Sequence, residues 1–333
     1  MASDPFTDAL LIYALRRATE GAARAAYEWL GRGEKSLSDR AAMNAMRCEL
    51  DQLPIGGTVV VGDASGDEKG SLRTGQRIGS PQASLRFDIA VDPVEGTSYL
   101  AKGLTNAMAV MALAPEGTLY QPGPAFYMEK FAAPPAAKGK IDPTAPVEEK
   151  LRALAGILDK PVRELTVFAL EKPRHNELVA RIHALGSRVA LYPAGDVAGA
   201  LMASIPGSGI DALVGTGGTP EGVLSACAIR TLGGEFQARL DPQLPSEIAA
   251  VKKAGLDTTR WLSAEELVRS ERVYFAATGI TTGLLFEGVE RTRGMERTQT
   301  LLISGITGER QLLTTYHTLN ENPRAGRKGD ANA

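Results

Sequence analysis

The stretch that decides the fold and the chemistry of this chain is Asp88-Ile89-Ala90-Val91-Asp92-Pro93-Val94-Glu95-Gly96-Thr97. Its first half alternates apolar side chains, Ile89 and Val91, which predicts a short β-strand. Pro93 has no backbone N–H to donate and is therefore expected to end that strand. The carboxylates of Asp92 and Glu95 then lie together at the strand end.

Two carboxylates held close together repel one another unless a cation lies between them. Hard cations such as Mg²⁺ and Mn²⁺ bind carboxylate and carbonyl oxygens, and usually keep waters and substrate phosphates as further ligands. Because Gly96 allows a sharp turn and Thr97 adds a hydroxyl, the stretch predicts half of a metal site that awaits a phosphate. An acidic surface turn is the alternative for a D-x-x-E pattern taken alone.

Size and composition limit the class of protein. A chain of 333 residues with 44% hydrophobic residues predicts two lobes or one large α/β unit. A net charge of -2 gives no electrostatic basis for binding nucleic acid or an anionic membrane, and no apolar run is long enough to span a bilayer. Cys48 and Cys227 lack metal-ligand spacing and predict free thiols in the cytoplasm. The histidines are too scattered for a zinc site: His175, His183 and His317.

Strand and helix patterns alternate along the chain, which predicts an α/β fold. Strands are expected at residues 58–61, 107–114, 127–131, 165–170, 188–191, 212–214, 273–276 and 300–303, and helices at residues 10–30, 40–50, 147–158, 176–185, 196–202 and 223–232. Residues 165–191 predict a strand–helix–strand unit with a parallel pair of strands. Residues 235–265 predict a variable and partly helical excursion. Prolines and small residues near position 135 predict a boundary between two lobes, at 1–135 and 136–319. The polar end of the chain, which contains Gly and Pro, predicts a disordered tail at 320–333.

Further carboxylates lie at the ends of expected elements. Ligands of α/β proteins bind at strand ends, so these side chains are expected to converge. Each of them taken alone is more typical of a solvated turn or a helix cap than of a ligand. They are Asp39, Asp63, Asp92, Glu95 and Glu221.

A phosphate-binding segment is expected after the strand at 165–170. Lys172 and Arg174 precede a helix there, and two cations at a helix N-terminus favour an anion, although a basic turn is the alternative. Tyr127 is expected either to contact a sugar or to pack in the core, and His175 to be structural. Gly217-Gly218 is similar to a phosphate-cradling turn.

These strings together resemble a known family. DPVEGT resembles the D-P-[ILV]-[DE]-G-T signature of the metal-dependent, lithium-sensitive sugar and inositol phosphatases, and the chain resembles their class II fructose-1,6-bisphosphatase branch across roughly residues 8–317. The matching strings besides residues 88–97 begin at Trp29 (WLGRGEK), Ala41 (AAMNAMR), Tyr127 (YMEK), Lys172 (KPRH), Gly217 (GGTPEG) and Ala277 (ATGIT).

The resemblance implies a layered α-β-α-β-α sandwich with two sheets, a homo-oligomer (dimer or tetramer) and in-line attack by water on a phosphomonoester. It implies a Mg²⁺ or Mn²⁺ site made by Asp39, Asp63, Asp92, Glu95 and Glu221. It implies catalytic roles for Asp39, Thr97 and Lys35, with Thr97 orienting the attacking water and Asp39 as its partner. It implies substrate contacts from Glu95, Gly96, Thr97, Tyr127, Lys172, Arg174, Asp196 and Gly218.

The chain departs from the family pattern at the expected site. Asp63 stands where the family has a metal-binding Glu, and Ser65 and Ala194 stand where it has acidic residues. Leu37 replaces a usual Thr. The hypothesis is a cytoplasmic phosphatase that removes the C1 phosphate of fructose 1,6-bisphosphate or a close analogue. The alternatives are a phosphatase for another sugar phosphate, such as sedoheptulose bisphosphate or one of specialised metabolism, and a sugar-phosphate-binding paralogue without catalysis.

Overall fold

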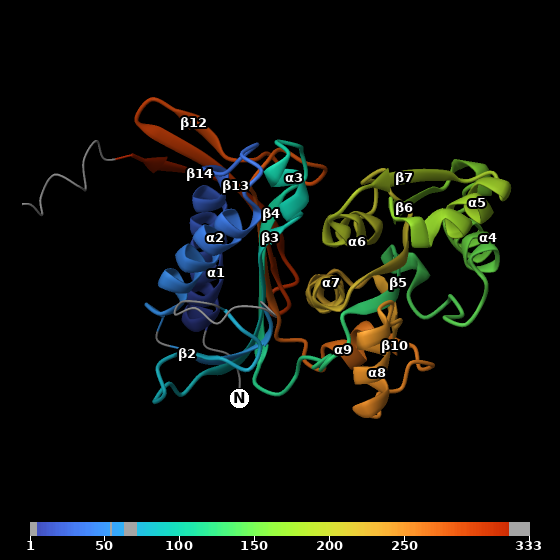
Figure 1. The fold of residues 1–333 in the computed structure, drawn as a ribbon, viewed down its shortest axis with the longest axis horizontal. Helices are drawn as coiled ribbons and strands as arrows, with labels where there is room; N and C mark the ends of the chain where they lie inside the picture. Colours follow the sequence, from blue (N-terminus) through green and yellow to red (C-terminus); the bar gives the residue numbers. More distant parts are fainter. Residues whose placement is uncertain (1–4, 54, 63–71, 320–333) are drawn as a thin grey trace, which may run out of the picture.

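A computed structural model describes residues 5–53, 55–62 and 72–319, in which helices and sheets form five alternating layers (Figure 1). The predictions for Asp63, Ser65 and the tail at 320–333 lie outside the described residues. From one side of the molecule to the other, the layers are α1 (Pro5–Tyr27) with α2 (Lys35–Leu50), a first sheet, α6 (Asp196–Ser204) with α7 (Thr219–Leu232), a second sheet, and α4 (Val147–Ile157) with α5 (Asn176–Ala184). The expected α-β-α-β-α sandwich is confirmed.

The first sheet is mixed. Its spatial order is β12 (Glu290–Thr292), β13 (Met295–Ser304), β11 (Tyr274–Gly279), β4 (Met108–Pro115), β3 (Arg86–Glu95), β1 (Gly56–Val61) and β2 (Arg77–Gly79), with β14 (Arg310–Thr318) also paired to β13. β1 and β3 run parallel, whereas β3 and β4 are antiparallel, as expected for neighbours along the chain.

The second sheet has the order β10 (Leu262–Ser263), β9 (Glu235–Leu240), β5 (Tyr127–Ala133), β8 (Ala212–Gly218), β6 (Thr166–Leu170) and β7 (Arg188–Tyr192). The predicted strand–helix–strand unit is confirmed, because β6 and β7 pair in parallel and α5 connects them. The prediction that residues 235–265 form a variable, partly helical segment is wrong in part, because the segment contains β9, which pairs with β5. The helices there are α8 (Pro245–Lys253) and α9 (Ala264–Leu267).

The sheets do not follow the division of the chain at residue 135. β5 lies before that point but belongs to the second sheet, and β11 to β14 lie far after it but belong to the first. The extent of the two lobes as domains stays a prediction.

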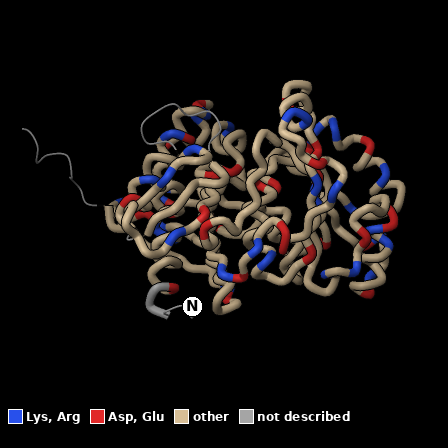
Figure 2. Tube along the Cα trace, turned by 90° about the horizontal axis from the view of Figure 1, so that it is seen from below, with Lys and Arg blue, Asp and Glu red and all other residues tan. Residues whose placement is uncertain are grey.

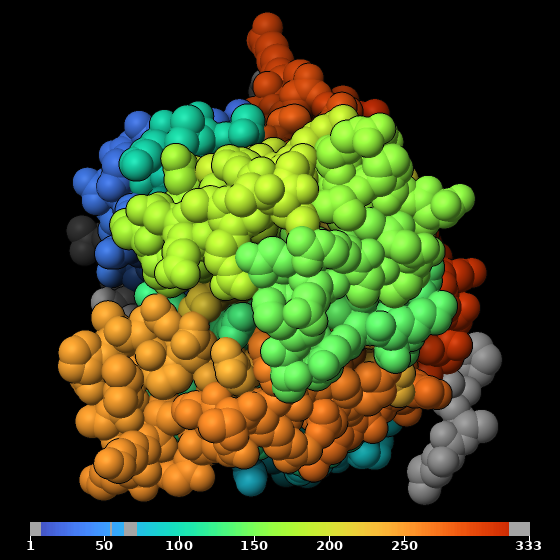
Figure 3. Space-filling model, turned by 90° about the vertical axis from the view of Figure 1, so that its right-hand side faces the viewer, coloured from blue at the N-terminus to red at the C-terminus, as the bar shows by residue number. Residues whose placement is uncertain are grey.

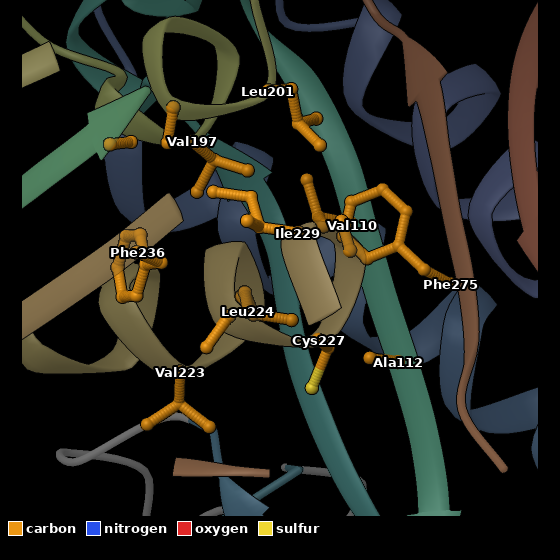
Figure 4. Packing of buried hydrophobic residues seen from close by; sticks show 14 of the residues in the cluster. Val110, Ala112, Val197, Leu201, Val223, Leu224, Cys227, Ile229, Phe236 and Phe275 are labelled. Atoms are coloured by element: carbon orange, nitrogen blue, oxygen red, sulfur yellow. The ribbon is translucent and has the colours of Figure 1, made fainter. Parts of the chain in front are cut away.

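The central core lies between the sheets around α7. Cys227 and Ile229 of α7 pack there with Val110 of β4 and Phe275 of β11, and all four side chains are buried (Figure 4). Burial of apolar surface is the main stabilising term of a fold, so this layer fixes α6 and α7 against both sheets. Both helices begin at the same side of the core, and their first residues contribute to the site described below.

Lys and Arg positions are interspersed with Asp and Glu positions over both halves of the molecule (Figure 2). Among the described residues, no helix has the length and apolar character needed to cross a membrane.

Candidate active site

The opening stretch forms a strand with an irregularity at its carboxylates. β3 does not end at Pro93 as expected but continues to Glu95. Asp92 pairs with Val110 and Glu95 with Met108, so three steps along β3 match two steps along β4. In a regular strand, residues three apart point to opposite faces. The extra residue of this bulge brings Asp92 and Glu95 to the same face, the one that looks toward α6 and α7.

Three carboxylates meet at this point. Asp92, Glu95 and Glu221 each offer an oxygen, and these atoms all lie within 4.8 Å of one another. Glu95 accepts a hydrogen bond from Val197 N (3.2 Å) in the first turn of α6, and Glu221 lies in the first turn of α7. Helix N-termini favour negative charge, which offsets part of the repulsion among the three groups.

Burial first, and then the neighbouring negative charges, raise the pKa values of all three carboxylates. Burial and the charge of Glu221 raise the pKa of Asp92 to about 7. Burial and the charge of Asp92 raise the pKa of Glu95 well above its usual range. Burial and the charge of Asp196 also raise the pKa of Glu221, while the ammonium of Lys130 opposes this rise. Raised pKa values at three neighbouring carboxylates indicate a place where a nearby positive charge would be stabilised.

The residues present fit a divalent cation. Glu221 Oε2 is buried and has no hydrogen-bond partner among the described residues, and such an orphaned oxygen is suited to a metal. A Cβ at Gly218 would lie only 1.8 Å from this oxygen, so the glycine provides the space that the carboxylate occupies. Gly217 does the same for Asp196, with 1.9 Å to Oδ2. Gly217 and Gly218 therefore leave space for the carboxylates of Asp196 and Glu221. The sequence had indicated a different role for them, a turn that cradles a phosphate.

The residues expected to be catalytic lie beside this cluster. Thr97 begins α3 (Thr97–Ala101), and its Oγ1 lies 3.2 Å from Asp39 Oδ1 and 3.0 Å from Val94 O, so its hydrogen is donated to one of them at a time. Lys35 is exposed and donates to Ser98 Oγ (3.0 Å). α2 begins at Lys35 and not at residue 40 as expected, which places Asp39 inside the helix.

The expected phosphate-binding segment faces the same space. Arg174 donates two hydrogen bonds to Thr216 O (3.0 and 2.8 Å), and its guanidinium lies over the ring of Tyr127, 5.1 Å from the centroid. His175 is buried: its Nδ1 donates to Leu170 O (2.7 Å), and its Nε2 accepts from Thr216 N (2.8 Å). This histidine is therefore structural and ties the end of β6 to β8.

A pocket of about 650 Å³ joins the two parts of the site. It brings together most of the residues that the sequence predicted: Asp92, Glu95, Gly96, Thr97, Tyr127, Lys172, Arg174, Asp196, Gly218 and Glu221. Asp39 and Lys35 lie behind Thr97 and Ser98 and do not line it. The pocket is bounded by the yellow-green segment after β6 and by Leu244 of the orange segment, and the space-filling view shows a hollow between these two segments (Figure 3).

The chain matches the family described as "Bacterial fructose-1,6-bisphosphatase, glpX-encoded" over residues 9–317. It belongs to this family. It is 42% identical to the Escherichia coli K12 protein named fructose-1,6-bisphosphatase 1 class 2, and 40% identical to the Thermosynechococcus vestitus protein named D-fructose 1,6-bisphosphatase class 2/sedoheptulose 1,7-bisphosphatase. Each alignment covers 91% of this chain and 94% of the relative. As a class II fructose-1,6-bisphosphatase, the chain is by family a phosphoric monoester hydrolase.

Two residues of the site were not expected from the sequence. Tyr99 lies in α3, and its hydroxyl donates to Ala194 O (2.7 Å) and accepts from Ala194 N (3.1 Å), which holds the loop before α6 against the first sheet. Lys130 lies in β5 and forms a buried ion pair with Asp196, 2.6 Å from Nζ to Oδ2. Both belong to or neighbour the quoted family strings, but their partners lie more than sixty residues away in the sequence.

Proposed function

We propose that this chain hydrolyses the C1 phosphate of fructose 1,6-bisphosphate, or of a close analogue, with Mg²⁺ or Mn²⁺ as cofactor. The observation that carries the proposal is a pocket lined both by a carboxylate cluster suited to a metal and by the cations Lys172 and Arg174. A sugar with two phosphates fits this distribution of charge, because the metal would hold one phosphate and the cations the other. Relatives named fructose-1,6-bisphosphatase support the same substrate.

Asp92, Glu95 and Glu221 would hold the metal. Asp39 and Asp63 stay predicted ligands. When bound, the metal neutralises charge on the transferring phosphoryl group and makes water a better nucleophile.

The surrounding residues would position the reactants. If Thr97 donates its hydrogen to Asp39, the lone pairs of its Oγ1 can accept a hydrogen bond from the attacking water. Asp39 is then the proton acceptor of that relay. The ammonium of Lys35 lies at Ser98, the residue after Thr97 in α3, where it would stabilise the negative charge of the phosphoryl group. Arg174, already fixed by Thr216 O, presents a rigid guanidinium to the second phosphate.

The test is phosphate release from a panel of sugar phosphates with Mn²⁺, with Mg²⁺ and with EDTA. Fructose 1,6-bisphosphate should yield fructose 6-phosphate and inorganic phosphate in the presence of metal, and ³¹P NMR of the product shows which phosphate has left. Release of the C6 phosphate would contradict the proposed orientation. Background release from every sugar phosphate would favour the non-catalytic binding protein.

A seven-carbon ketose bisphosphate is the second candidate. The small side chain of Ala194 lines the pocket beside Asp196, which leaves space where a larger sugar could extend. The relative from Thermosynechococcus vestitus is named for both fructose and sedoheptulose bisphosphates. The ratio of kcat/KM for these two substrates decides between the candidates.

A homo-oligomer, either dimer or tetramer, is part of the proposal. Its support is the edge strand β14, on which Leu312 and Tyr316 are 53% and 65% exposed. Natural proteins usually cover or charge such edges, and a second copy of the chain would cover this one. Light scattering behind a sizing column would give the mass in solution, and a monomer would contradict it. The cytoplasmic location stays a prediction.

A further inference from the structure

Lys130 is a buried cation behind the carboxylate cluster. Only 1% of its surface is exposed, and its Nζ lies 2.6 Å from Asp196 Oδ2 and 2.8 Å from Gly218 O. A buried ion pair costs desolvation that the attraction between the two charges rarely exceeds. A contribution to stability is therefore a weak explanation for this pair, and its neighbours suggest another.

Asp196 lies close enough to the cluster to act on it. The residues on either side of it adjoin Glu95: Val197 N donates to Glu95 Oε1 (3.2 Å), and a Cβ at Gly195 would lie 3.9 Å from the same oxygen. Its carboxylate lines the same pocket as Asp92, Glu95 and Glu221. What distinguishes Asp196 from these three is its ion pair with Lys130.

The backbone around the ion pair is shaped to accommodate it. A Cβ at Gly217 would lie 1.9 Å from Asp196 Oδ2 and 3.0 Å from Lys130 Nζ. Gly217 has no positive φ, so its lack of a side chain serves space and not backbone conformation. The space at Gly217 is thus a second observation, independent of the hydrogen bonds, that the local structure accommodates the ion pair of Lys130 and Asp196.

Lys130 also connects the two helices that supply the site. Asp196 opens α6, whose Val197 N donates to Glu95. Gly218 precedes α7, which carries Glu221 in its first turn. One ammonium thus contacts the start of each helix.

We propose that Lys130 is a positioning residue that withholds Asp196 from the metal and balances its charge, so that the pair sets the affinity of the site for a divalent cation. This inference rests on the metal site of the proposed function, but not on the identity of the sugar. In Lys130→Met, Asp196 becomes an uncompensated carboxylate beside the cluster, and the cation should bind more tightly. In Asp196→Asn, Lys130 becomes an uncompensated cation there, and the cation should bind more weakly.

The experiment is titration calorimetry of MnCl₂ alone into EDTA-treated, dialysed protein. Lys130→Met is expected to bind Mn²⁺ about tenfold more tightly than the unmodified chain, and Asp196→Asn about tenfold more weakly, from the charge of one neighbour. The double variant, Lys130→Met with Asp196→Asn, restores the charge balance and should return to the original affinity. A purely structural role would not produce changes of opposite sign that cancel.

Lys130→Met leaves a buried charge unpaired and can fail to fold. Gly217→Ala then serves in its place, because the added Cβ displaces the Asp196 carboxylate from Lys130 while both charges remain. Freed from Lys130, the carboxylate adds its negative charge to the cluster, and this variant should bind Mn²⁺ more tightly.

The proposal is overturned if Lys130→Met and Gly217→Ala keep the original affinity, if the double variant differs from it, or if the unmodified chain binds no Mn²⁺. Lack of phosphatase activity with the expected pattern of Mn²⁺ affinities would instead refute the proposed substrate alone. The two failures are therefore distinguishable.

Discussion

Replacing Gly218 by alanine tests the metal site through one carboxylate. The added Cβ would lie 1.8 Å from Glu221 Oε2 and 2.6 Å from its Cδ, where a contact below 3.0 Å is not tolerated. The oxygen must therefore move by at least about 1.2 Å, the difference between 3.0 and 1.8 Å. Metal–ligand distances vary by only about 0.2 Å. The backbone can stay in place, since the φ of -65° and ψ of 140° at Gly218 suit any residue.

The displacement should remove Glu221 from the metal and lower the affinity for Mn²⁺ about 100-fold or more, by the upper range for disturbed metal ligands. At a Mn²⁺ concentration of about 100 times the Kd of the unmodified chain, that chain gains about 2.7 kcal/mol of stability from binding. A variant with 100-fold weaker binding gains about 0.4 kcal/mol under the same conditions. For a chain of this length the difference corresponds to about 3 °C in the Tm shift that Mn²⁺ produces. The assay is thermal unfolding of each protein with Mn²⁺ and with EDTA, accompanied by phosphate release.

Gly156→Ala is the matched control. It adds the same methyl group in α4, where nothing lies within 4 Å of the new Cβ. Its Tm shift on addition of Mn²⁺ should equal that of the unmodified chain. A full Mn²⁺ shift and full turnover in Gly218→Ala would refute the reasoning that the space at this glycine holds a metal ligand.

Four further predictions concern other parts of the site. Asp92→Asn should abolish phosphate release while the circular dichroism of the fold is retained, and unimpaired turnover would reject Asp92 as a ligand. Because the pKa of Asp92 is raised from 3.8 to about 7, its contribution to the stability of the metal-free chain is present below pH 3.8 and is lost as the pH rises through 7. The urea midpoint of EDTA-treated protein should therefore fall between pH 4 and 8, and fall less in Asp92→Asn; an equal fall contradicts the assignment. Arg174→Lys keeps the positive charge but loses two hydrogen bonds to the Thr216 carbonyl and the position over the Tyr127 ring. KM for the bisphosphate should therefore rise about tenfold, with a smaller change in kcat. A change confined to kcat would contradict the assignment of this arginine to the second phosphate. Tyr99→Phe removes the hydroxyl that holds Ala194 and should cost about 1 kcal/mol of stability and raise KM; unchanged KM and urea midpoint would show that other contacts hold the loop.

Local patterns predicted much of this fold. The strand that carries Asp92 was predictable from the apolar side chains of Ile89 and Val91, and its antiparallel neighbour from the apolar run at residues 107–114. β14 was not, since it is an edge strand whose side chains are mostly exposed, and burial does not mark it in the sequence. The partial error at 235–265 has a similar origin, because β9 mixes Glu, Gln and Arg with apolar residues.

The chemistry of the site was predictable where it depends on residue type, and not where it depends on long-range geometry. A D-x-x-E pair is visible in the sequence, but only the pairing with β4 shows that a bulge brings both carboxylates to one face. The ion pair of Lys130 joins residues 66 positions apart, and no local rule connects them. Likewise, the glycines at 217 and 218 were visible, but the carboxylates that need their space were not.

The position of Ala194 bears on whether the departures from the family pattern accompany loss of function or a change of substrate. Tyr99 holds this residue by its backbone N–H and C=O, so the loop keeps its place whatever side chain residue 194 carries. Gly195 turns at a φ of +77°, and a Cβ there would meet the Tyr99 ring at 3.3 Å. The frame that delivers Asp196 to Lys130 is therefore intact. The loss of an acidic side chain at this point changes what the pocket presents to a sugar and leaves the carboxylate cluster undisturbed, which favours a change of substrate preference over decay of the site.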